Sequence, residues 1–268
     1  MLYFRNDYGT GAHPAVLEAL CGTNMELTPG YGTDQYTRQA AETIRDLCGV
    51  PDAAVHFLMG GTQANKTAIA AFLRPYEAVL AAASGHICVH EAGAVEQDGH
   101  AVLRLPAPDG KLTPELLRSA MAGPVNEHTV VPRLAYISNT TELGTVYTRP
   151  ELLALRRCCD ELGLYLYCDG ARLGSAMDAG GTGFADYGAC CHAFTIGGTK
   201  NGLLLGEALV IAEPALRPGF RNCMKQQGAM LAKGRLLGVQ FEAVLRDGLY
   251  LSLAAHANAQ AKRLAAGL

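Results

Sequence analysis

The first chemically suggestive segment of the chain is the run Gly60-Gly61-Thr62-Gln63-Ala64-Asn65, which follows an apolar stretch and precedes a helical pattern. Small residues at the start of a helix leave backbone N–H groups free. Together with the helix dipole and the Thr62 hydroxyl, these groups can surround a phosphate. The run predicts either a phosphate-binding turn or, as is common for glycine before a helix, an ordinary tight turn.

Two later segments place a reactive side chain at the end of an expected strand. The second segment is Leu164-Tyr165-Leu166-Tyr167-Cys168-Asp169-Gly170-Ala171-Arg172. Its Asp169 carboxylate either pairs with a protonated ring nitrogen of a ligand or caps the next turn and pairs with Arg172. The third segment is Thr195-Ile196-Gly197-Gly198-Thr199-Lys200-Asn201-Gly202. The neutral amine of a lysine in such a confined turn can form an imine with an aldehyde, although an isolated lysine is usually a solvated surface charge.

The three segments follow one another in the order that a pyridoxal-phosphate enzyme uses, and further motifs accompany them. These motifs are Arg5-Asn6-Asp7, Tyr31-Gly32-Thr33-Asp34, and His86 followed by Glu91-Ala92-Gly93. As a set they resemble the pyridoxal-phosphate enzymes of the aspartate-aminotransferase fold type, and specifically the low-specificity L-threonine aldolases of the β-eliminating lyase group. The resemblance extends from Arg5 to the helical region near Gly238.

The resemblance implies a role for each matching residue around the cofactor. Lys200 resembles the Schiff-base lysine, and Asp169 resembles the partner of the pyridinium nitrogen, where a carboxylate favours the protonated ring. Arg172 resembles the family arginine that lies beside the cofactor ring and near the substrate. His86 resembles the histidine that stacks on the ring and assists proton transfer, so the expected catalytic residues are Lys200, His86 and Asp169.

The remaining matches imply contacts with the phosphate and the substrate. Gly61, Thr62 and Gln63 match the family's phosphate turn. Asn6 stands where many relatives have a serine that helps to hold the substrate carboxylate, and an amide can still donate a hydrogen bond there. Tyr31 matches a loop that reaches toward the active site at a dimer interface. No metal ligand is expected.

The chain departs from the family pattern in two places. Where bacterial members have an Asn-Thr-His stretch with a second active-site histidine, this chain has Ser138-Asn139-Thr140-Thr141-Glu142-Leu143-Gly144. Glu142 or an ordered water is then expected to replace that histidine near the substrate. Relatives also have an arginine after Gly-Gly-Met, whereas Leu231 follows Gly228-Ala229-Met230 here, so Lys225 or Lys233 is expected to supply the phosphate cation.

The elements that must position these residues follow from the alternation of apolar runs and helical patterns. This alternation is typical of an α/β fold with a mainly parallel sheet covered by helices on both faces. The expected strands are Ala54–Leu58, Ala78–Ala82, Leu134–Ser138, Leu164–Cys168, His192–Ile196 and Ala208–Ala212. The expected helices are Gln63–Leu73, Thr113–Met121 and Arg149–Leu162, with helical structure again from about Asn222 to the last residue.

The domain organisation is expected to be an N-terminal arm at residues 1–30, a large cofactor-binding domain at residues 31–245, and the start of a small domain at residues 246–268. Enzymes of this fold type normally continue into a small domain whose arginine binds the substrate α-carboxylate. The sequence stops about where that domain should begin. We therefore expect either a truncated protein or another group in place of that arginine.

Composition excludes several classes of protein. The chain has 268 residues with 22 basic and 25 acidic side chains, a net charge of −3, so a basic nucleic-acid-binding face is not expected. No apolar run reaches the ~18 residues of a membrane span, and the first residues do not resemble a signal peptide. The nine cysteines include no CxxC pair, which favours free thiols and the cytoplasm.

The expected function is a pyridoxal-phosphate-dependent lyase that cleaves L-threonine or L-allo-threonine to glycine and acetaldehyde, acting as a homodimer or homotetramer. A second hypothesis is another β-hydroxy-amino-acid aldolase or an amino-acid β-eliminating lyase, because the same cofactor residues serve all of them. A third, from a different class, is a catalytically inactive cofactor-binding protein that lacks the small domain.

Overall fold

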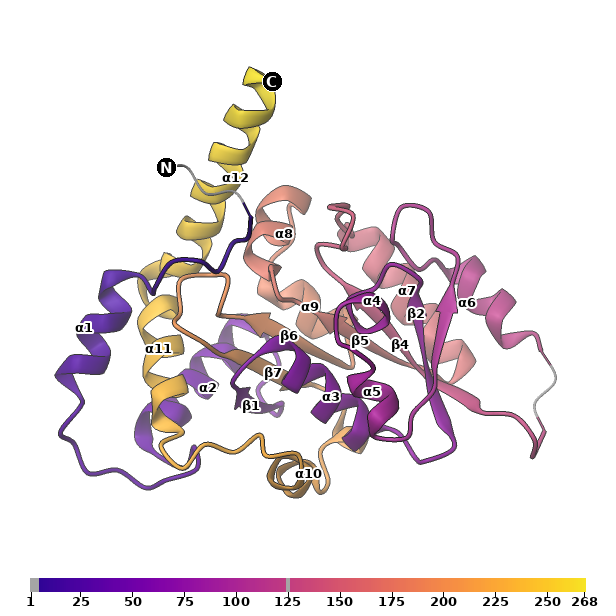
Figure 1. Cartoon of the computed structure of the whole chain (residues 1–268), viewed down its shortest axis with the longest axis horizontal. Coiled ribbons are helices and arrows are strands. Elements are labelled where there is room, and N and C mark those ends of the chain that lie inside the picture. The colour runs from indigo at the N-terminus through magenta and orange to yellow at the C-terminus, as the bar shows by residue number, and fades with distance from the viewer. Residues whose placement is uncertain (1–4, 124–125) are drawn as a thin grey trace.

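The computed structural model describes residues 5–123 and 126–268 and places a seven-stranded sheet between layers of helices (Figure 1). The strands run in the order β1-β7-β6-β5-β4-β2-β3, with β7 antiparallel to both of its neighbours and the other pairs parallel. The mainly parallel sheet is therefore confirmed. The strands are β1 (Ala54–Leu58), β2 (Glu77–Ala82), β3 (Val102–Leu105), β4 (Val131–Ser138), β5 (Tyr165–Asp169), β6 (Ala193–Gly197) and β7 (Glu207–Ile211).

One strand, β3, was not predicted from the sequence, and it pairs only with β2 at the edge of the sheet. Its four residues, Val-Leu-Arg-Leu, include the exposed Arg104 and are partly exposed throughout. An edge strand has one open side and needs no continuous apolar run, so its pattern resembles a loop. The six predicted strands all form, with ends within a few residues of the expected ones.

Local capping explains where the main helices begin. Thr113 accepts a hydrogen bond from Leu116 N and Pro114 is the first residue of α6, as its sequence predicts. The predicted helix over residues 149–162 is α7. The helices are α1 (Pro14–Gly22), α2 (Gln35–Cys48), α3 (Gly61–Phe72), α4 (His86–Val89), α5 (Ala94–Gln97), α6 (Pro114–Met121), α7 (Arg149–Leu162), α8 (Leu173–Gly180), α9 (Phe184–Cys190), α10 (Phe220–Gln226), α11 (Arg235–Leu245) and α12 (Leu249–Gly267), with short 3₁₀ turns at Pro214–Leu216 and Arg246–Gly248.

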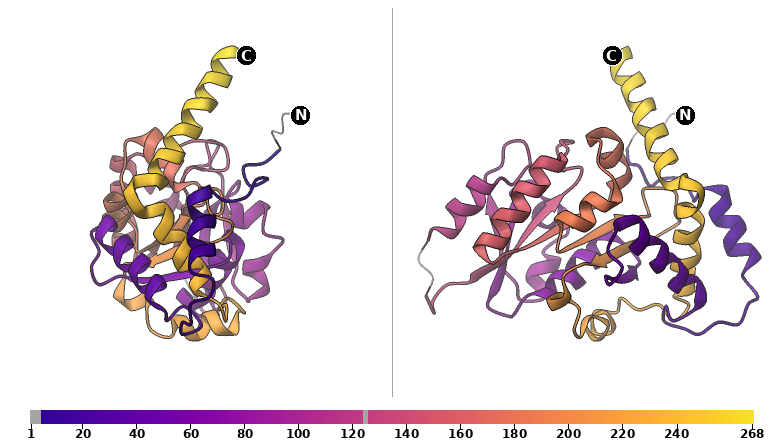
Figure 2. Two further views of the ribbon diagram at one scale, coloured as in Figure 1. Left: turned by 90° about the vertical axis from the view of Figure 1, so that its left-hand side faces the viewer. Right: turned by 180° about the vertical axis from the view of Figure 1, so that it is seen from behind.

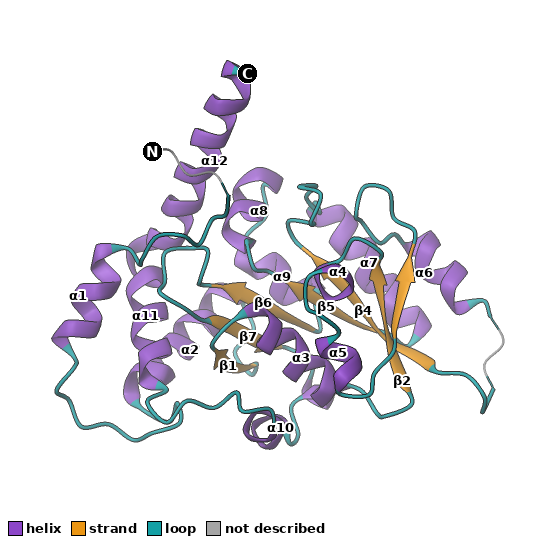
Figure 3. Cartoon of the chain, viewed as in Figure 1, coloured by secondary structure: helices purple, strands orange, loops and turns teal. Residues whose placement is uncertain are grey.

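Helices lie on both sides of the sheet (Figure 3). The sheet has an apolar layer on each face, because successive strand residues point to opposite sides. On one face, Tyr136 and Tyr167 lie under α3, α4, α5 and α10. On the other face, Leu166 and Cys168 lie under α2, α6, α7, α9 and α11. Both faces are buried, and the polar ends of the strands are left to form a site.

The last helix, α12, extends away from the sheet (Figure 2). Its first turns are anchored because Tyr250 is buried and donates a hydrogen bond to Gly197 O at 2.9 Å. The predicted boundary at residues 245 and 246 falls at the link between α11 and α12, and the division into an arm and two domains stays a prediction. No helix in the described part of the chain is long and apolar enough to cross a membrane.

The turn after β5 depends on Gly170, whose N–H donates to Thr195 Oγ1 at 2.8 Å. A Cβ at this position would collide with the carbonyl oxygen of Thr195 on the neighbouring strand. Only glycine therefore lets the residues after Asp169 lie this close to β6.

We predict that Gly170→Ala lowers the free energy of unfolding by about 3 kcal/mol, because the new methyl group forces the backbones of β5 and β6 apart. Urea denaturation measures the change. Gly22→Ala is the matched control, since a Cβ at Gly22 meets no atom within 4 Å. Equal stability of the two variants would contradict this account of the turn.

Candidate active site

A cavity of about 230 Å³ opens at the carboxyl ends of β4, β5 and β6. Ligands in open α/β sheets bind at this edge because the strand ends expose loops and helix N-termini there. The cavity brings together seven residues that the sequence analysis singled out: Gly61, Thr62, His86, Glu142, Asp169, Arg172 and Lys200. Residues separated by more than a hundred positions thus meet in one space.

Five other candidates do not line this cavity. The Gln63 side chain accepts a hydrogen bond from Met59 N at 3.3 Å, so its amide is turned toward the preceding loop. Asn6 Oδ1 accepts one from Tyr8 N at 3.1 Å and stabilises a local turn. Tyr31 lines a different, smaller cavity, and Lys225 Nζ lies 4.6 Å from the centre of its ring. Lys233 is exposed.

The Asp169 carboxylate is the most firmly held group of the site. It is 5% exposed, and its Oδ2 accepts hydrogen bonds from Tyr136 Oη at 2.7 Å and from Asn65 Nδ2 at 2.8 Å. Oδ1 accepts one from Ala171 N at 3.0 Å. Because an ionised carboxylate offers about four acceptor positions, Oδ1 can take a further donor from the cavity that Asp169 lines.

Asn65 connects Asp169 to a second buried carboxylate. Its Nδ2 donates both to Asp169 and to Glu91 Oε1, each at 2.8 Å, while its Oδ1 accepts from Tyr167 Oη at 2.9 Å. The oxygens of Asp169 and Glu91 and a ring nitrogen of His86 lie within 4.8 Å of one another, a spacing compatible with a metal ion. The Asn65 amide already donates to both carboxylates, so hydrogen bonds hold this group together.

His86 begins α4, and its orientation is fixed from behind by Glu91. Nδ1 lies 2.7 Å from Glu91 Oε1, and the Glu91 side chain is fully buried. The hydrogen bond to Glu91 raises the pKa of His86 above 6.5, against the opposing effect of burial, and the charges of Glu91, Asp169 and Glu142 add to the rise. The His86 side chain also lines the cavity.

The N-terminus of α3 can receive a phosphate. Asp34 and Thr113 cap α2 and α6 with side-chain hydrogen bonds, whereas Gly60 offers α3 no side chain. The Cβ positions of Gly60 and Gly61 are open, with no atom within 4 Å. Unpaired N–H groups and the positive end of the helix dipole therefore face the cavity, which is an arrangement that binds anions.

Arg172 is held by a residue that the sequence analysis left without a role. Its Nε and Nη2 donate to the two Asp7 carboxylate oxygens at 2.5 and 3.1 Å. Burial opposes ionisation of Asp7, but the hydrogen bonds and charge of Arg172, together with the charge of Lys200, lower the pKa of Asp7 below 3.8. The arginine thus already binds a carboxylate with fork geometry at the edge of the cavity.

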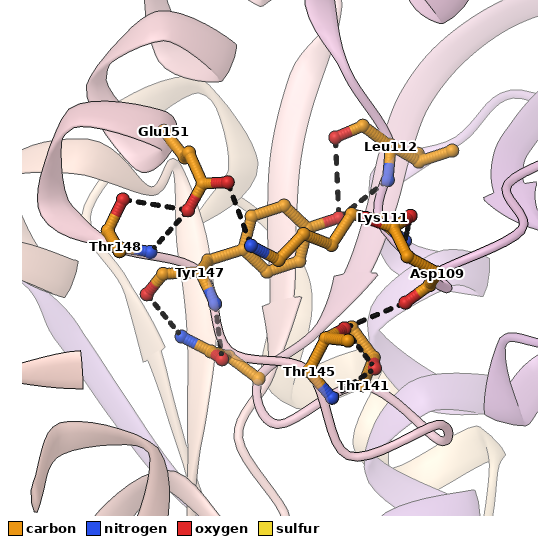
Figure 4. A network of polar contacts seen from close by, with 9 residues as sticks. Asp109, Lys111, Leu112, Thr141, Thr145, Tyr147, Thr148 and Glu151 are labelled. Carbon is orange, nitrogen blue, oxygen red and sulfur yellow. Dashed lines mark hydrogen bonds and ion pairs between the residues drawn. The ribbon is translucent and has the colours of Figure 1, made fainter. Parts of the chain in front are cut away.

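Glu142 is placed by a tightly bonded loop. Thr141 N donates to Thr145 O at 2.9 Å, and the two threonine hydroxyls lie 2.7 Å apart. Figure 4 shows this pair connected to Asp109, whose carbonyl accepts from Thr145 Oγ1 at 2.7 Å, beside the Lys111–Glu151 ion pair. The departure from the family pattern at this loop therefore brings a carboxylate to the cavity.

Several residues that complete the site were not predicted from the sequence. Glu91 and Asn65 lie inside motifs that the sequence already marked. Their polar side chains within those motifs could have indicated that they belong to the site. Tyr136 and Tyr167 share a strand face with Ser138 and Asp169, so the period of two along β4 and β5 could have found them. Glu207, the first residue of β7, lines the cavity and is only 5% exposed.

Comparisons with known proteins identify the family of this chain. Residues 4–268 match the family described as β-eliminating lyase. The low specificity L-threonine aldolase of Pseudomonas aeruginosa is 35% identical over 98% of this chain and 77% of its own length. The low specificity L-threonine aldolase of a Pseudomonas species is also 35% identical, over 95% of this chain and 75% of its own length. A solved threonine aldolase from Leishmania major has a TM-score of 0.96 and 48% identity, covering 98% of this chain and 78% of that chain.

We predict that Glu91→Gln lowers the pH at which the His86 ring titrates, because the amide cannot stabilise the imidazolium by charge. The raised pKa means that the His86–Glu91 pair stabilises the fold below pH 6.5 and that this contribution is lost as pH rises through the higher folded value. NMR titration of the histidine rings measures the change at His86, with the exposed His128 as an internal control. An unchanged His86 titration would contradict the assignment.

Proposed function

Because the chain belongs to the β-eliminating lyase family, we propose that it is a pyridoxal-phosphate-dependent aldolase that cleaves L-threonine or L-allo-threonine to glycine and acetaldehyde. The observation that carries the proposal is the convergence of Lys200, the anchored Asp169 carboxylate and the uncapped start of α3 on one cavity. The named activity of the relatives supports the same reaction.

The residues present fit pyridoxal phosphate. The phosphate fits the N–H groups at the start of α3, the aldehyde carbon fits the Lys200 amine, and the ring nitrogen fits the open acceptor position of Asp169. His86 lines the same cavity, and its imidazole is the aromatic side chain that would stack on the cofactor ring. When bound, the cofactor accepts the electron pair that is released as the substrate Cα–Cβ bond breaks.

The protein's own residues hold the charge beside the ring nitrogen, bind the substrate carboxylate and move protons at the reacting carbon. Three donors keep Asp169 in place, so its negative charge favours a proton on the ring nitrogen. Arg172 binds the substrate α-carboxylate in the fork that Asp7 now occupies, and Asp7 holds the guanidinium in the binding orientation between turnovers. His86, polarised by Glu91, assists proton movement beside the reacting carbon.

Glu142 is the group that we assign to the β-hydroxyl. It is a half-buried carboxylate on the same cavity, where the family's second histidine is absent. A carboxylate in this place can accept the hydroxyl proton as the carbonyl of acetaldehyde forms. A proton returned to Cα from within the cavity then completes glycine, so the reaction is balanced without another reagent.

We further propose a homodimer or homotetramer in the cytoplasm. Tyr31 lies outside the Lys200 cavity of its own chain and is partly exposed with Lys225 against its ring, which suits a loop that serves a neighbouring subunit. All nine cysteines are free, and each lies in the described part of the chain. Free thiols are typical of a reducing compartment.

The second candidate is cleavage of another β-hydroxy amino acid, or β-elimination from an amino acid. The observation that favours it is Glu142 itself, because this carboxylate lines the cavity where the family's second histidine is absent. Product analysis separates the reactions, because an aldolase releases glycine and an aldehyde, whereas an eliminating lyase releases ammonia and a keto acid. Bound cofactor without any product would instead indicate an inactive cofactor-binding protein.

We predict that the purified chain with pyridoxal phosphate shows a visible absorption band and releases acetaldehyde from L-threonine. Lys200→Ala should lose both, because no other amine occupies this position. The spectrum and an acetaldehyde assay check the outcome. A band that survives in Lys200→Ala would overturn the lysine assignment, and a band without acetaldehyde or another aldehyde would overturn the aldolase.

We predict that Glu142→Gln lowers kcat about 10² to 10⁴-fold while the cofactor band is kept, because a positioned base contributes about this factor. The exposed Glu161, which pairs with Arg118, gives the matched control Glu161→Gln. Steady-state kinetics with L-threonine and L-allo-threonine measures the effect. Wild-type kcat in Glu142→Gln would exclude Glu142 as the base.

A further inference from the structure

Two buried carboxyl groups, those of Asp169 and Glu91, lie close together beside His86. Asp169 is 5% exposed, and the Glu91 side chain is fully buried. One oxygen of each carboxyl group and a ring nitrogen of His86 all lie within 4.8 Å of one another. Two carboxylates at such a spacing normally repel each other, and the pair then takes up a proton. Here an amide lies between the two groups instead.

Asn65 is that amide, and it donates one N–H bond to each carboxyl group. Its Nδ2 lies 2.8 Å from Glu91 Oε1 and 2.8 Å from Asp169 Oδ2, and the residue is 1% exposed. The amide nitrogen carries two hydrogens, so both are used. A carboxylate that accepts such a bond is stabilised in its charged form. The amide thus takes the place of the proton that the two carboxyl groups would otherwise share.

The orientation of the Asn65 amide is fixed by Tyr167, whose Oη donates to Asn65 Oδ1 at 2.9 Å. Burial, together with the charges of Asp169 and Glu91, keeps the pKa of Tyr167 well above 10, so its hydroxyl retains the donated proton. A flipped amide would turn its oxygen toward two carboxylates and lose both bonds to them. The two N–H groups therefore face the carboxyl groups.

The two carboxyl groups depend on Asn65 to different degrees. Asp169 accepts two further hydrogen bonds, one from a tyrosine hydroxyl and one from a backbone N–H. Besides the amide, Glu91 Oε1 has only His86 Nδ1, at 2.7 Å. Glu91 Oε2 is buried and has no hydrogen-bond partner among the residues that the structure describes. Without the amide, Glu91 would be a buried carboxylate with a single donor, which is costly, so the loss falls on Glu91 and on the histidine bound to it.

We propose that Asn65 is a positioning residue that keeps Glu91 ionised and thereby holds a proton on Nδ1 of His86. With the amide in place Glu91 only accepts, so the proton that His86 can exchange is the one at Nε2, which makes no hydrogen bond within residues 5–123 and 126–268. Without the amide, the N–H bond at Nδ1 breaks and an O–H bond forms on Glu91. Imidazolium and carboxylate then become a neutral ring and a neutral acid, with the number of protons unchanged.

The inference rests on the proposed function for its purpose, because proton transfer beside the substrate requires one defined donor atom on His86. The charged and titratable groups around His86 and Glu91 are Cys88, His90, Glu96, Arg104, Tyr136, Glu142, Tyr167 and Asp169. Burial raises the pKa of the cysteine and of both tyrosines, so these three are neutral at pH 6. A substitution at Asn65 alters none of these groups, so a change at His86 reports on the amide.

The substitution Asn65→Leu separates this role from packing, because leucine has nearly the shape of asparagine and no N–H donor. Thr67→Val is the matched control on the same helix, α3. Thr67 is 0% exposed, and its hydroxyl has no hydrogen-bond partner in the described part of the chain. Thermal unfolding at pH 6 verifies that both variants are folded.

The test is NMR of the His86 ring nitrogens in the full chain, with ¹⁵N-labelled histidine and no added cofactor, at pH 6. The pKa of His86 is raised above 6.5 by the hydrogen bond to Glu91, so at pH 6 we expect both ring nitrogens to be protonated in the wild type and in Thr67→Val. In Asn65→Leu, Nδ1 should lose its proton while Nε2 keeps its own. The ratio of the two proton positions should change about tenfold or more, as expected for loss of one hydrogen bond to a charged group.

A doubly protonated His86 ring in folded Asn65→Leu would overturn the proposal, because a purely structural role predicts lower stability without movement of the proton. If leucine prevents folding, Tyr167→Phe decides. It removes the hydroxyl that orients the amide and should lower the pH at which His86 titrates, whereas an unchanged titration would contradict the proposal. The measurement uses neither threonine nor cofactor, so it remains decisive even if the proposed aldolase activity fails.

Discussion

The site depends on one buried negative charge that the fold must compensate with neutral donors. Asp169 lies at the end of a central strand, away from bulk water, where an uncompensated carboxylate would be costly. Tyr136, Asn65 and the Ala171 N–H supply three hydrogen bonds, and none of them brings a positive charge. Burial and the charge of Asp169 hold the pKa of Tyr136 well above 10, so its hydroxyl remains a donor. The charge is thus stabilised but not neutralised, and it can act on a ligand.

The same constraint explains how distant segments are tied together. Asn65 on α3 joins the first turns of this helix to the end of β5, and through Glu91 it also joins both to His86 on α4. Gly170 allows the chain after Asp169 to lie against β6, which brings Lys200 into the same cavity. The start of α3, the Asp169 carboxylate and His86 are therefore linked by hydrogen bonds, and Lys200 lines the same cavity.

Much of the fold and the centre of the site followed from the sequence, for identifiable reasons. Strands buried on both faces give continuous apolar runs, and their ends were marked by glycine, so β5, β6 and the residues Asp169 and Lys200 could be placed. The edge strand β3 lacks such a run and was missed. The partners Tyr136, Glu91 and Asp7 could not be assigned, because their contacts join residues 33, 26 and 165 positions away in the sequence. Glu207 was missed because one carboxyl group at the start of an apolar strand has no local signal.

The central claim is that the charge of Asp169, exposed to a bound cofactor, drives chemistry at the substrate Cα. The most direct measurement is NMR of the rate at which the cofactor-loaded enzyme exchanges a glycine Cα proton for solvent deuterium, in the wild type and in the nearly isosteric Asp169→Asn. We predict ready exchange in the wild type and an exchange rate lower by about 100-fold or more in the variant. The reason is that the Asp169 charge raises the pKa of the cofactor ring nitrogen, and each pKa unit corresponds to about a factor of ten in rate. Equal exchange rates, with the cofactor bound in both proteins, would contradict it.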